Sequence, residues 1–274
     1  MKLKNKVALV TGGAQGLGKA IALAMAREGA DTVICDINEA TLPVSAKEIE
    51  AVGGTCLGVR CDVSSAESVN DMYKRVVERF GTLHILVNNA GLVQTGQANE
   101  ENRTRLYTMM TKPVPKASLG VTKDLSDDEW HRYWGVNVHG VFYCTRAALK
   151  LMEEQRYGKI INIASIAGIA GFSAFQPAYC ATKGAVLAFT RSVAVEVAGA
   201  NIYVNAIAAG GILTPPMEAY LARCSEEERN SALQLIPLGK VGRPEEYASL
   251  AVYLASDEHY LVGQTISPNG GMVL

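Results

Sequence analysis

A glycine-rich turn, set between a short apolar run and an amphipathic segment, places the strongest constraint on how this chain folds. The turn spans Thr11–Gly18, follows the apolar run Lys6–Val10, and opens the segment Gly16–Glu28, whose apolar residues recur once per helical turn. A strand, a glycine turn and a helix in that order bring backbone N–H groups and the positive end of a helix dipole beside the strand end. This context predicts a site for a phosphate-bearing ligand.

Strand-like and helix-like segments alternate along the rest of the chain. The predicted strands are Lys6–Val10, Thr32–Cys35, Thr55–Arg60, Leu83–Val87, Lys159–Ile163, Ile202–Ile207 and Gln264–Ser267. The predicted helices are Gly16–Glu28, Ala40–Val52, Ala66–Phe80, Ser126–Gln155 (with Ser126 as N-cap), Pro177–Val197 and Pro244–Ala255. This alternation predicts a doubly wound α/β fold, the Rossmann fold, with a mostly parallel seven-stranded sheet, helices on both faces, and a single domain over residues 1–274.

Residues inside the turn are predicted to lie against the phosphates. Gly12 permits the tight turn, Gly16 lets the backbone approach a pyrophosphate, and Gly18 allows the helix to pack closely. Gln15 and Leu17, which alternate with these glycines, are expected to contribute to the same site. The sequence therefore predicts a dinucleotide bound at the carboxyl ends of the first strands.

Asp36, at the end of the second predicted strand, indicates which dinucleotide is bound. A carboxylate at this place accepts hydrogen bonds from an adenosine ribose diol and repels a 2′-phosphate. No lysine or arginine that would favour such a phosphate occupies Ala14, Gln15 or Ile37. The sequence thus favours NAD over NADP as the cofactor.

Composition narrows the function classes. The chain has 274 residues, 49% of them hydrophobic, and a net charge of −1, which together indicate a folded globular protein without an electrostatic case for nucleic acid or an anionic membrane. No apolar run approaches the about 20 residues that span a bilayer, and no signal-peptide core is apparent. The six cysteines form no C-x-x-C pair and the four histidines lack metal-ligand spacing. We expect reduced thiols, no metal site, and a cytoplasmic protein.

Tyr179 and Lys183 are the strongest candidates for catalytic residues. They lie four residues apart on the predicted helix Pro177–Val197 and so share a face. A fixed cation beside a phenol favours the phenolate, which predicts a pKa for Tyr179 below its ordinary value near 10. The pair alone is a weak signal, but Ser165 just upstream and the glycine turn strengthen it.

Together, these motifs resemble the short-chain dehydrogenase/reductase family in its compact single-domain form, from Lys4 to Gly271. The family's glycine motif stands at Thr11–Gly18 and its Asn-Asn-Ala-Gly motif at Asn88–Gly91. Its catalytic residues fall on Asn137, Ser165, Tyr179 and Lys183. The resemblance implies cofactor contacts at Tyr179 and Lys183, and also at Asp62, Val63, Asn89, Ala90, Gly91, Ile212 and Thr214.

The resemblance also implies a mechanism, which is hydride transfer between nicotinamide and a substrate carbinol carbon. Tyr179 would act as general base in oxidation and general acid in reduction. Lys183 would lower the pKa of Tyr179 and bind the nicotinamide ribose, while Ser165 would orient the substrate oxygen. Asn137 would hold a water that relays protons from Lys183 to solvent. Asn88 is expected to be structural, with its amide bridging strand backbones.

An extra segment separates two of these motifs. Gly91 and Asn137 lie 46 positions apart, which is longer than the resemblance leads us to expect, and the added residues are Gln94–Leu125. Connections of this length are often lids or binding loops. One interpretation is that the substrate entrance is lined or covered by Tyr107, Met109 or Met110. The other is that the segment is a surface elaboration or an oligomer contact.

Apolar residues near Tyr179 are candidates for the substrate pocket, although such stripes more often belong to the core. They are Ile166, Ile169, Phe172, Phe175, Leu213, Met217, Tyr220 and Leu221. No clustered arginines accompany them, so we expect an uncharged, mostly apolar secondary alcohol or ketone, open-chain or cyclic. The leading interpretation is an NAD-dependent alcohol dehydrogenase or ketone reductase. A 3-oxoacyl-thioester reductase and a noncatalytic dinucleotide-binding sensor or scaffold stay open as alternatives.

Self-association is the remaining expectation. The resemblance implies that the helices Ser126–Gln155 and Pro177–Val197 pair across a two-fold axis, which gives a homodimer or homotetramer. An apolar arc on the second helix is the candidate contact, formed by Val186, Phe189, Val193 and Val197.

Overall fold

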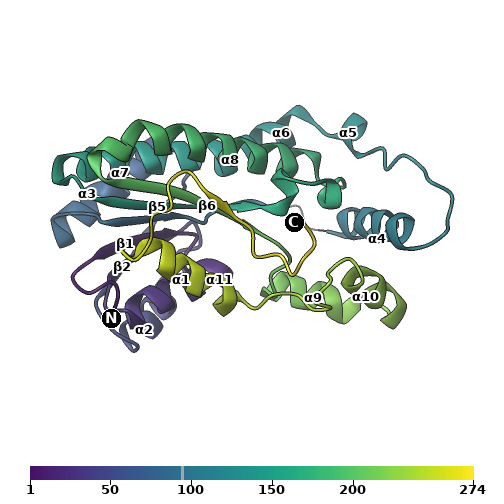
Figure 1. The fold of residues 1–274 in the computed structure, drawn as a ribbon, viewed down its shortest axis with the longest axis horizontal. Coiled ribbons are helices and arrows are strands. Elements are labelled where there is room, and N and C mark those ends of the chain that lie inside the picture. The colour runs from purple at the N-terminus through teal and green to yellow at the C-terminus, as the bar shows by residue number, and fades with distance from the viewer. Residues whose placement is uncertain (94–95) are drawn as a thin grey trace.

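A parallel sheet forms the centre of the molecule. The computed structural model of the chain describes residues 1–93 and 96–274. Over these residues the strands form one seven-stranded parallel sheet in the order β3-β2-β1-β4-β5-β6-β7 (Figure 1). The strands are β1 (Val7–Thr11), β2 (Asp31–Asp36), β3 (Cys56–Arg60), β4 (Ile85–Asn88), β5 (Gly158–Ser165), β6 (Ile202–Ala209) and β7 (Thr265–Ile266). The predicted doubly wound fold is confirmed, and its strand order reverses between β1 and β4.

Helices cover both faces of the sheet. One face carries α1 (Gly16–Arg27), α2 (Leu42–Glu50) and α11 (Pro244–Ala255), and the other carries α3 (Ala66–Phe80), α7 (Gly140–Gln155) and α8 (Pro177–Val197) (Figure 1). Strand β1 contributes side chains to the cores on both faces of the sheet. Ala8 and Val10 pack in the core under α1, α2 and α11, while Val7 and Leu9 pack in the core under α3, α7 and α8. A strand buried on both faces is therefore apolar throughout, without the alternation of a half-exposed strand.

The predicted helix Ser126–Gln155 is interrupted. Helix α6 (Asp127–Trp134) ends in a π-helical turn, Gly135–His139, before α7 begins. The predicted N-cap is confirmed, because the Ser126 hydroxyl accepts a hydrogen bond from the backbone N–H of Glu129 at 3.2 Å. A π-turn adds one residue to a helical turn without changing composition, so apolar periodicity did not reveal it.

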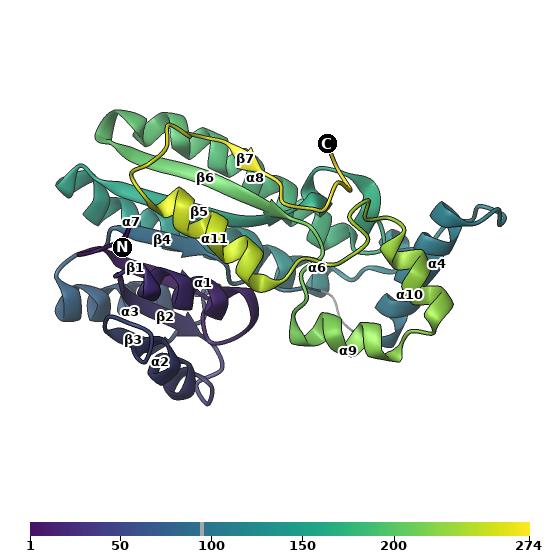
Figure 2. The ribbon, with the colours of Figure 1, turned by 60° about the horizontal axis from the view of Figure 1, so that its bottom comes forward.

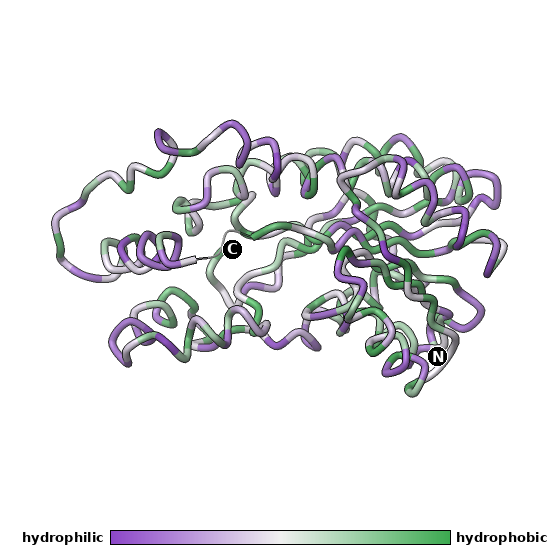
Figure 3. Tube along the Cα trace, turned by 180° about the vertical axis from the view of Figure 1, so that it is seen from behind, coloured by the Kyte–Doolittle hydropathy of each residue, from purple (hydrophilic) through white to green (hydrophobic). Residues whose placement is uncertain are grey.

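The extra segment folds mostly as helix. It contains α4 (Gln97–Thr111) and the short α5 (Val121–Asp124), whereas Gln94 and Thr95 lie outside the described residues. Helix α4 packs beside α9 (Pro215–Arg223) and α10 (Glu226–Leu233), where Glu100 pairs with Arg223 and Lys112 pairs with Glu227 (Figure 2). Figure 3 shows hydrophilic residues along much of α4, in contrast to the hydrophobic strands. Without an apolar stripe, α4 gave no helical signal.

The apolar arc predicted for subunit pairing lies inside the subunit. Val186, Val193 and Val197 are buried in the core, and Phe189 is partly buried against it. These side chains face the sheet because α8 is one of its covering helices. In the described part of the chain, no helix is long and apolar enough to cross a membrane.

Candidate active site

The glycine turn has the backbone geometry that its sequence predicts. Gly12 and Gly16 have positive φ, at 62° and 55°, which disfavours side-chain-bearing residues. A Cβ added at Gly18 would lie 2.2 Å from the Gly12 carbonyl oxygen, so helix α1 packs directly on the turn. Among the described residues, the N-cap Gln15 makes no side-chain capping bond and the first turn of α1 contains no acidic residue. The helix N-terminus therefore suits a pyrophosphate.

Hydrogen bonds join the glycine turn to the segment after β4. The Thr11 hydroxyl accepts from the backbone N–H groups of Asn89 and Ala90, both at 3.0 Å. The Asn89 amide donates to the carbonyls of Thr11 and Gly12 at 2.9 and 3.2 Å. A Cβ at Gly12 would lie 3.0 Å from the Cα of Ala90, so a side chain at this positive-φ position would crowd the approach of the two motifs. These hydrogen bonds and close contacts join the glycine turn and the Asn-Asn-Ala-Gly motif into one connected unit.

Predicted adenosine contacts lie at the ends of β2 and β3. The Asp36 carboxylate accepts from the backbone N–H of Asn38 at 3.0 Å. The Asp62 carboxylate accepts from the backbone N–H and hydroxyl of Ser64 at 2.9 and 2.7 Å. Val63 is buried against Gly140, where an added Cβ would lie 2.8 Å from Val63 Cγ2. Only the backbone of Val63 therefore remains to contact a ligand.

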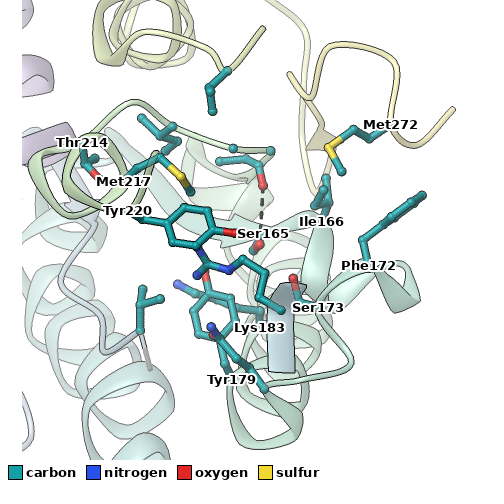
Figure 4. A pocket seen from close by; sticks show the side chains of 18 of the residues that line it. Ser165, Ile166, Phe172, Ser173, Tyr179, Lys183, Thr214, Met217, Tyr220 and Met272 are labelled. Atoms are coloured by element: carbon teal, nitrogen blue, oxygen red, sulfur yellow. Dashed lines mark hydrogen bonds between the residues drawn. The ribbon is translucent and has the colours of Figure 1, made fainter. Parts of the chain in front are cut away.

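The catalytic candidates meet at the ends of β5 and α8. Ser165 ends β5, and its hydroxyl accepts from the Ala167 N–H at 3.1 Å and donates to the Ala209 carbonyl at 3.4 Å. The Lys183 ammonium donates to the Ile163 carbonyl at 2.7 Å and lies 5.6 Å from the centroid of the Tyr179 ring. Figure 4 shows Ser165, Tyr179 and Lys183 on one side of a cavity.

The pKa of Tyr179 differs from the sequence-based expectation. Burial raises it above its ordinary value of 10, although hydrogen bonding with Ser165 partly opposes this effect. Burial also lowers the pKa of Lys183 to about 8. The Lys183 ammonium is directed to the Ile163 carbonyl and makes no hydrogen bond to the Tyr179 phenol among the described contacts. The expected lowering of the tyrosine pKa is therefore wrong for the protein alone.

Asn137 occupies the π-turn and links two parts of the site. Its Nδ2 donates to the Leu92 carbonyl and the Thr182 hydroxyl, both at 3.1 Å, and its Oδ1 accepts from the Leu92 N–H at 2.7 Å. A Cβ added at Gly91 would touch both Asn137 Oδ1, at 3.4 Å, and Lys183 Nζ, at 3.5 Å. The amide donors are thus committed to protein partners, while Oδ1 retains acceptor capacity on the Lys183 side.

Asn88 has a structural role, with partners other than those predicted. Its Nδ2 donates to Asn162 Oδ1 at 2.8 Å and to the Thr145 hydroxyl at 3.1 Å, and Asn162 donates to the Thr190 hydroxyl at 2.9 Å. The chain of contacts joins α7, β4, β5 and α8 through side chains, whereas we expected bonds to strand backbones. It fixes the sheet beneath the site.

A cavity of about 380 Å³ opens above Ser165 and Tyr179. Its lining includes the predicted site residues Leu17, Asn89, Gly91, Ser165, Tyr179, Lys183, Ile212 and Thr214. It also includes the predicted pocket residues Ile166, Phe172, Phe175, Met217, Tyr220, Leu221 and Tyr107. The other predicted site residues are not part of its lining: Gly12, Gln15, Gly16, Gly18, Asp36, Asp62, Val63, Ala90 and Asn137.

Several predicted pocket residues lie elsewhere, and others were missed. Ile169 is exposed, Met109 is buried in its own segment and Met110 is exposed, so these residues do not line the cavity. The lining gains Arg103, Gln176, Leu233, Ile236 and Met272. Arg103 precedes Tyr107 by four residues, which is a detectable signal once the segment is known to be helical. In the described residues, no group of three or more His, Cys, Asp or Glu side chains is arranged to hold a metal ion.

Comparisons with known proteins place this geometry in a family. The family model described as short chain dehydrogenase matches residues 6–224. A structure titled as a short-chain type dehydrogenase/reductase from Mycobacterium marinum superposes with a TM-score of 0.82, at 33% identity, over 99% of this chain and 97% of the other. Levodione reductase gives a TM-score of 0.82 at 30% identity, over 98% of each chain. The chain belongs to the short-chain dehydrogenase/reductase family.

Curated relatives within the family bear several names. The 3-oxoacyl-[acyl-carrier-protein] reductase FabG of Thermotoga maritima is 36% identical over the full length of both chains. The (2S)-[(R)-hydroxy(phenyl)methyl]succinyl-CoA dehydrogenase subunit BbsD of Thauera aromatica is 34% identical, over 100% of this chain and 99% of its own. The 2,5-dichloro-2,5-cyclohexadiene-1,4-diol dehydrogenase LinX of Sphingobium indicum is 35% identical, over 98% and 97%. The chain is an oxidoreductase of a family that uses nicotinamide dinucleotides.

Proposed function

We propose that this protein is an NAD-dependent oxidoreductase that interconverts a secondary alcohol and a ketone. One observation carries the proposal: Ser165, Tyr179 and Lys183 line the same cavity, and Thr214 at its rim faces the glycine turn. A Cβ added at Gly16 would lie 3.8 Å from the Thr214 methyl group, so the dinucleotide turn opens onto the reaction site. Redox cofactor and substrate would thus meet in one cavity.

Each catalytic side chain has a role that follows from its place. When bound, the nicotinamide supplies or accepts the hydride. Tyr179 donates its proton to the ketone oxygen in reduction and removes the hydroxyl proton in oxidation. Its raised pKa keeps it a phenol at neutral pH, which is the form that reduction requires. Ser165 holds the substrate oxygen near the phenol, and Lys183 supplies positive charge below it.

Asp36 supports NAD as the cofactor. It ends β2 beside the glycine turn, where the N–H of Gly13 donates to the Cys35 carbonyl. Its neighbour Ile37 is exposed and carries no charge for a 2′-phosphate. A carboxylate at this place accepts from ribose hydroxyls and repels phosphate.

A second candidate function is the reduction of 3-oxoacyl thioesters. Relatives from Thermotoga maritima, Synechocystis and Vibrio cholerae, each 35 or 36% identical, are named 3-oxoacyl-[acyl-carrier-protein] reductases, which supports this candidate. Ser165, Tyr179 and Lys183 would carry out this reduction too, so the catalytic geometry does not separate the two candidates. The apolar cavity walls, among them Phe172 and Met217, favour a substrate with an apolar body in either case.

The test is turnover by purified protein with each cofactor. Absorbance of the reduced cofactor is followed with NAD and NADP against secondary alcohols, including cyclic and aryl ones, and against a 3-oxoacyl thioester in reduction. We expect NAD-dependent turnover that Tyr179→Phe lowers by at least about 100-fold, because the proton donor is lost. Activity with NADP alone would overturn the assignment of Asp36. Tight cofactor binding without any turnover would favour the noncatalytic sensor.

We also propose that the protein is a cytoplasmic homodimer or homotetramer. All six cysteines are free thiols, and four of them are buried, which suits a reducing compartment. The exposed side of α7 and α8 carries Phe142, which is 40% exposed and stacks edge-on against Phe189. An exposed aromatic residue on paired helices is the feature that favours self-association there.

A further inference from the structure

Two cations line the substrate cavity, and no carboxylate does so in the part of the chain that the structure describes. One cation is Lys183, which the proposed chemistry already uses. The other is Arg103, from the middle of α4, and no step assigned so far needs it. A guanidinium stays charged at every physiological pH. The cavity lining therefore carries, at Arg103, a fixed positive charge that no lining carboxylate neutralises.

Aromatic rings from two other elements hold the Arg103 guanidinium. Its Cζ lies 4.4 Å from the ring centroid of Tyr220 on α9 and 5.2 Å from that of Phe175, just before α8. Tyr107, one turn along α4, makes an edge-on contact with Phe175 at a centroid distance of 6.2 Å. Rings attract the face of a guanidinium and leave its N–H donors in the plane available. The rings therefore fix the position of the Arg103 guanidinium without using its N–H donors.

A carboxylate close to Arg103 in the same helix already has a partner. Glu100, one turn before Arg103, pairs with Arg223 on α9. Over the described residues, Arg103 has ring contacts and lies in no ion pair. A partly buried charge without a counterion costs free energy, and an anionic ligand removes that cost. The geometry suits a bound anion on the substrate side of the cavity.

We propose that Arg103 binds a carboxylate of the substrate, so that the protein acts on hydroxy acids or oxo acids with an apolar body. The inference rests on the proposed oxidoreductase function and specifies its substrate class. Ser165 and Tyr179 would hold the reacting oxygen while Arg103 holds the carboxylate by paired N–H donors. Two fixed points determine which face of the carbinol carbon meets the cofactor.

This inference replaces the sequence-based expectation of an uncharged substrate. That expectation looked for clustered arginines near the apolar stripes, whereas a single arginine reaches the cavity from the extra segment. The carboxylate takes no part in the reaction. In oxidation, bound NAD would supply the hydride acceptor, and Tyr179 in its phenolate form would take the hydroxyl proton as the carbinol becomes a carbonyl.

Matched pairs of substrates test the inference. Aliphatic and aryl 3-hydroxy acids are compared with their methyl esters, using kcat/KM for wild type, Arg103→Gln, Arg103→Lys and the control Arg105→Gln. Arg105 is an exposed arginine on the same helix. We expect wild type to prefer the acids. Arg103→Gln should lower kcat/KM for the acids by roughly 10- to 100-fold and leave the esters within about twofold, because a charged hydrogen bond is lost.

The variants separate charge recognition from folding. Arg103→Lys keeps the charge and loses the paired donors, so it should retain an intermediate preference for the acids. Arg105→Gln should behave as wild type. Equal loss for acids and esters in Arg103→Gln, with the fold intact by circular dichroism, would reduce Arg103 to a scaffold residue and overturn the inference. Wild type that uses the esters as well as the acids would overturn it too, while the oxidoreductase function stands.

A binding measurement decides the matter if neither member of any pair is turned over. Isothermal titration then compares hexanoate with hexanamide on the protein saturated with NADH. Tighter binding of hexanoate to wild type and to Arg105→Gln, but not to Arg103→Gln, supports the carboxylate site. Equal affinity of wild type for both probes rejects it. Failure to bind both NADH and NADPH would instead reject the proposed oxidoreductase function, whereas binding of NADPH alone would reject only the assignment of Asp36.

Discussion

Lys183 is a buried cation that its neighbours do not neutralise. Its ammonium donates one short hydrogen bond, to the Ile163 carbonyl, and burial lowers its pKa to about 8 from 10.5. Keeping the side chain protonated at neutral pH therefore costs the fold about 3 kcal/mol, since each pH unit corresponds to about 1.4 kcal/mol. Such a cost in a proposed active site is typical of a residue kept for chemistry and not for stability.

We predict that Lys183→Met stabilises the protein and removes its activity. Methionine has a similar length and no charge, so the free energy of unfolding at pH 7 should rise by about 1–3 kcal/mol. The stability of wild type should increase between pH 8 and 10.5, because the unfolded chain keeps the Lys183 proton in that window and the folded chain releases it. The advantage of the variant should shrink over the same range.

Thermal denaturation of both proteins across this pH range measures the effect. Comparing the two proteins cancels the titration of other groups, which they share. A variant less stable than wild type at pH 7 would show that the lost bond to Ile163 outweighs the relieved desolvation.

For single residues, the sequence predicts where the side chains of the site lie better than it predicts their pKa values. Tyr179 and Lys183 meet the cavity because they share a helical face, and Ser165 meets it because strands of a parallel sheet end at one edge. The pKa of Tyr179 rises when a fall was expected, since burial and the direction of the Lys183 ammonium arise only in three dimensions. Arg103 was missed for the same reason.

Helix α4 is the element that distinguishes this site. It brings Arg103 and Tyr107 to the cavity, and it is fastened to α9 and α10 by the ion pairs Glu100–Arg223 and Lys112–Glu227. Both ion pairs are partly exposed, so each contributes at most about 1 kcal/mol. The ion pairs alone therefore contribute little to holding the helix, while its residues Arg103 and Tyr107 line the cavity.

We predict that replacing residues 98–120 with a Gly-Ser linker of about ten residues spares the fold and impairs substrate binding. Loss of the ring contacts around Phe175 and Tyr220 should raise the substrate KM at least about tenfold. The affinity for NADH should stay within about twofold, because the glycine turn and Asp36 lie on other elements. An unchanged KM in a folded variant would reject the role of α4 at the substrate entrance.

Some elements could be placed from sequence and others could not. The bounds of α3, α8 and α11 agree with the predicted ranges, because each has a clear start or stop: Ser65 caps α3, and Pro177 and Pro244 open α8 and α11. Helices α4 and α10 are mainly polar and pack on each other at the periphery, so they show no core-facing stripe. These two helices can be recognised from their packing in the structure, but not from the pattern of apolar residues in the sequence.

The order of the strands follows from general rules of parallel sheets. Right-handed crossovers and alternating helices leave few topologies, and they put the glycine turn, Ser165 and Thr214 at one edge of the sheet. Subunit assembly has no comparable rule. The arc on α8 that we expected at an interface is core, while Phe142 on α7 and Val195 on α8 remain exposed, at 40% and 80%.

We predict that Phe142→Glu breaks the proposed oligomer. The Phe142 ring packs edge-on against Phe189 at a centroid distance of 6.3 Å, and the Arg146 guanidinium lies over it at 4.8 Å, so the partly exposed ring is held in place on this face. A buried carboxylate at such a contact costs several kcal/mol, so light scattering should show a dimer or tetramer for wild type and a smaller species for the variant. Val44→Glu is the control, because Val44 is 58% exposed on α2, at the far edge of the sheet. Wild type that is already monomeric, or a variant as large as wild type, would contradict the assignment of this face.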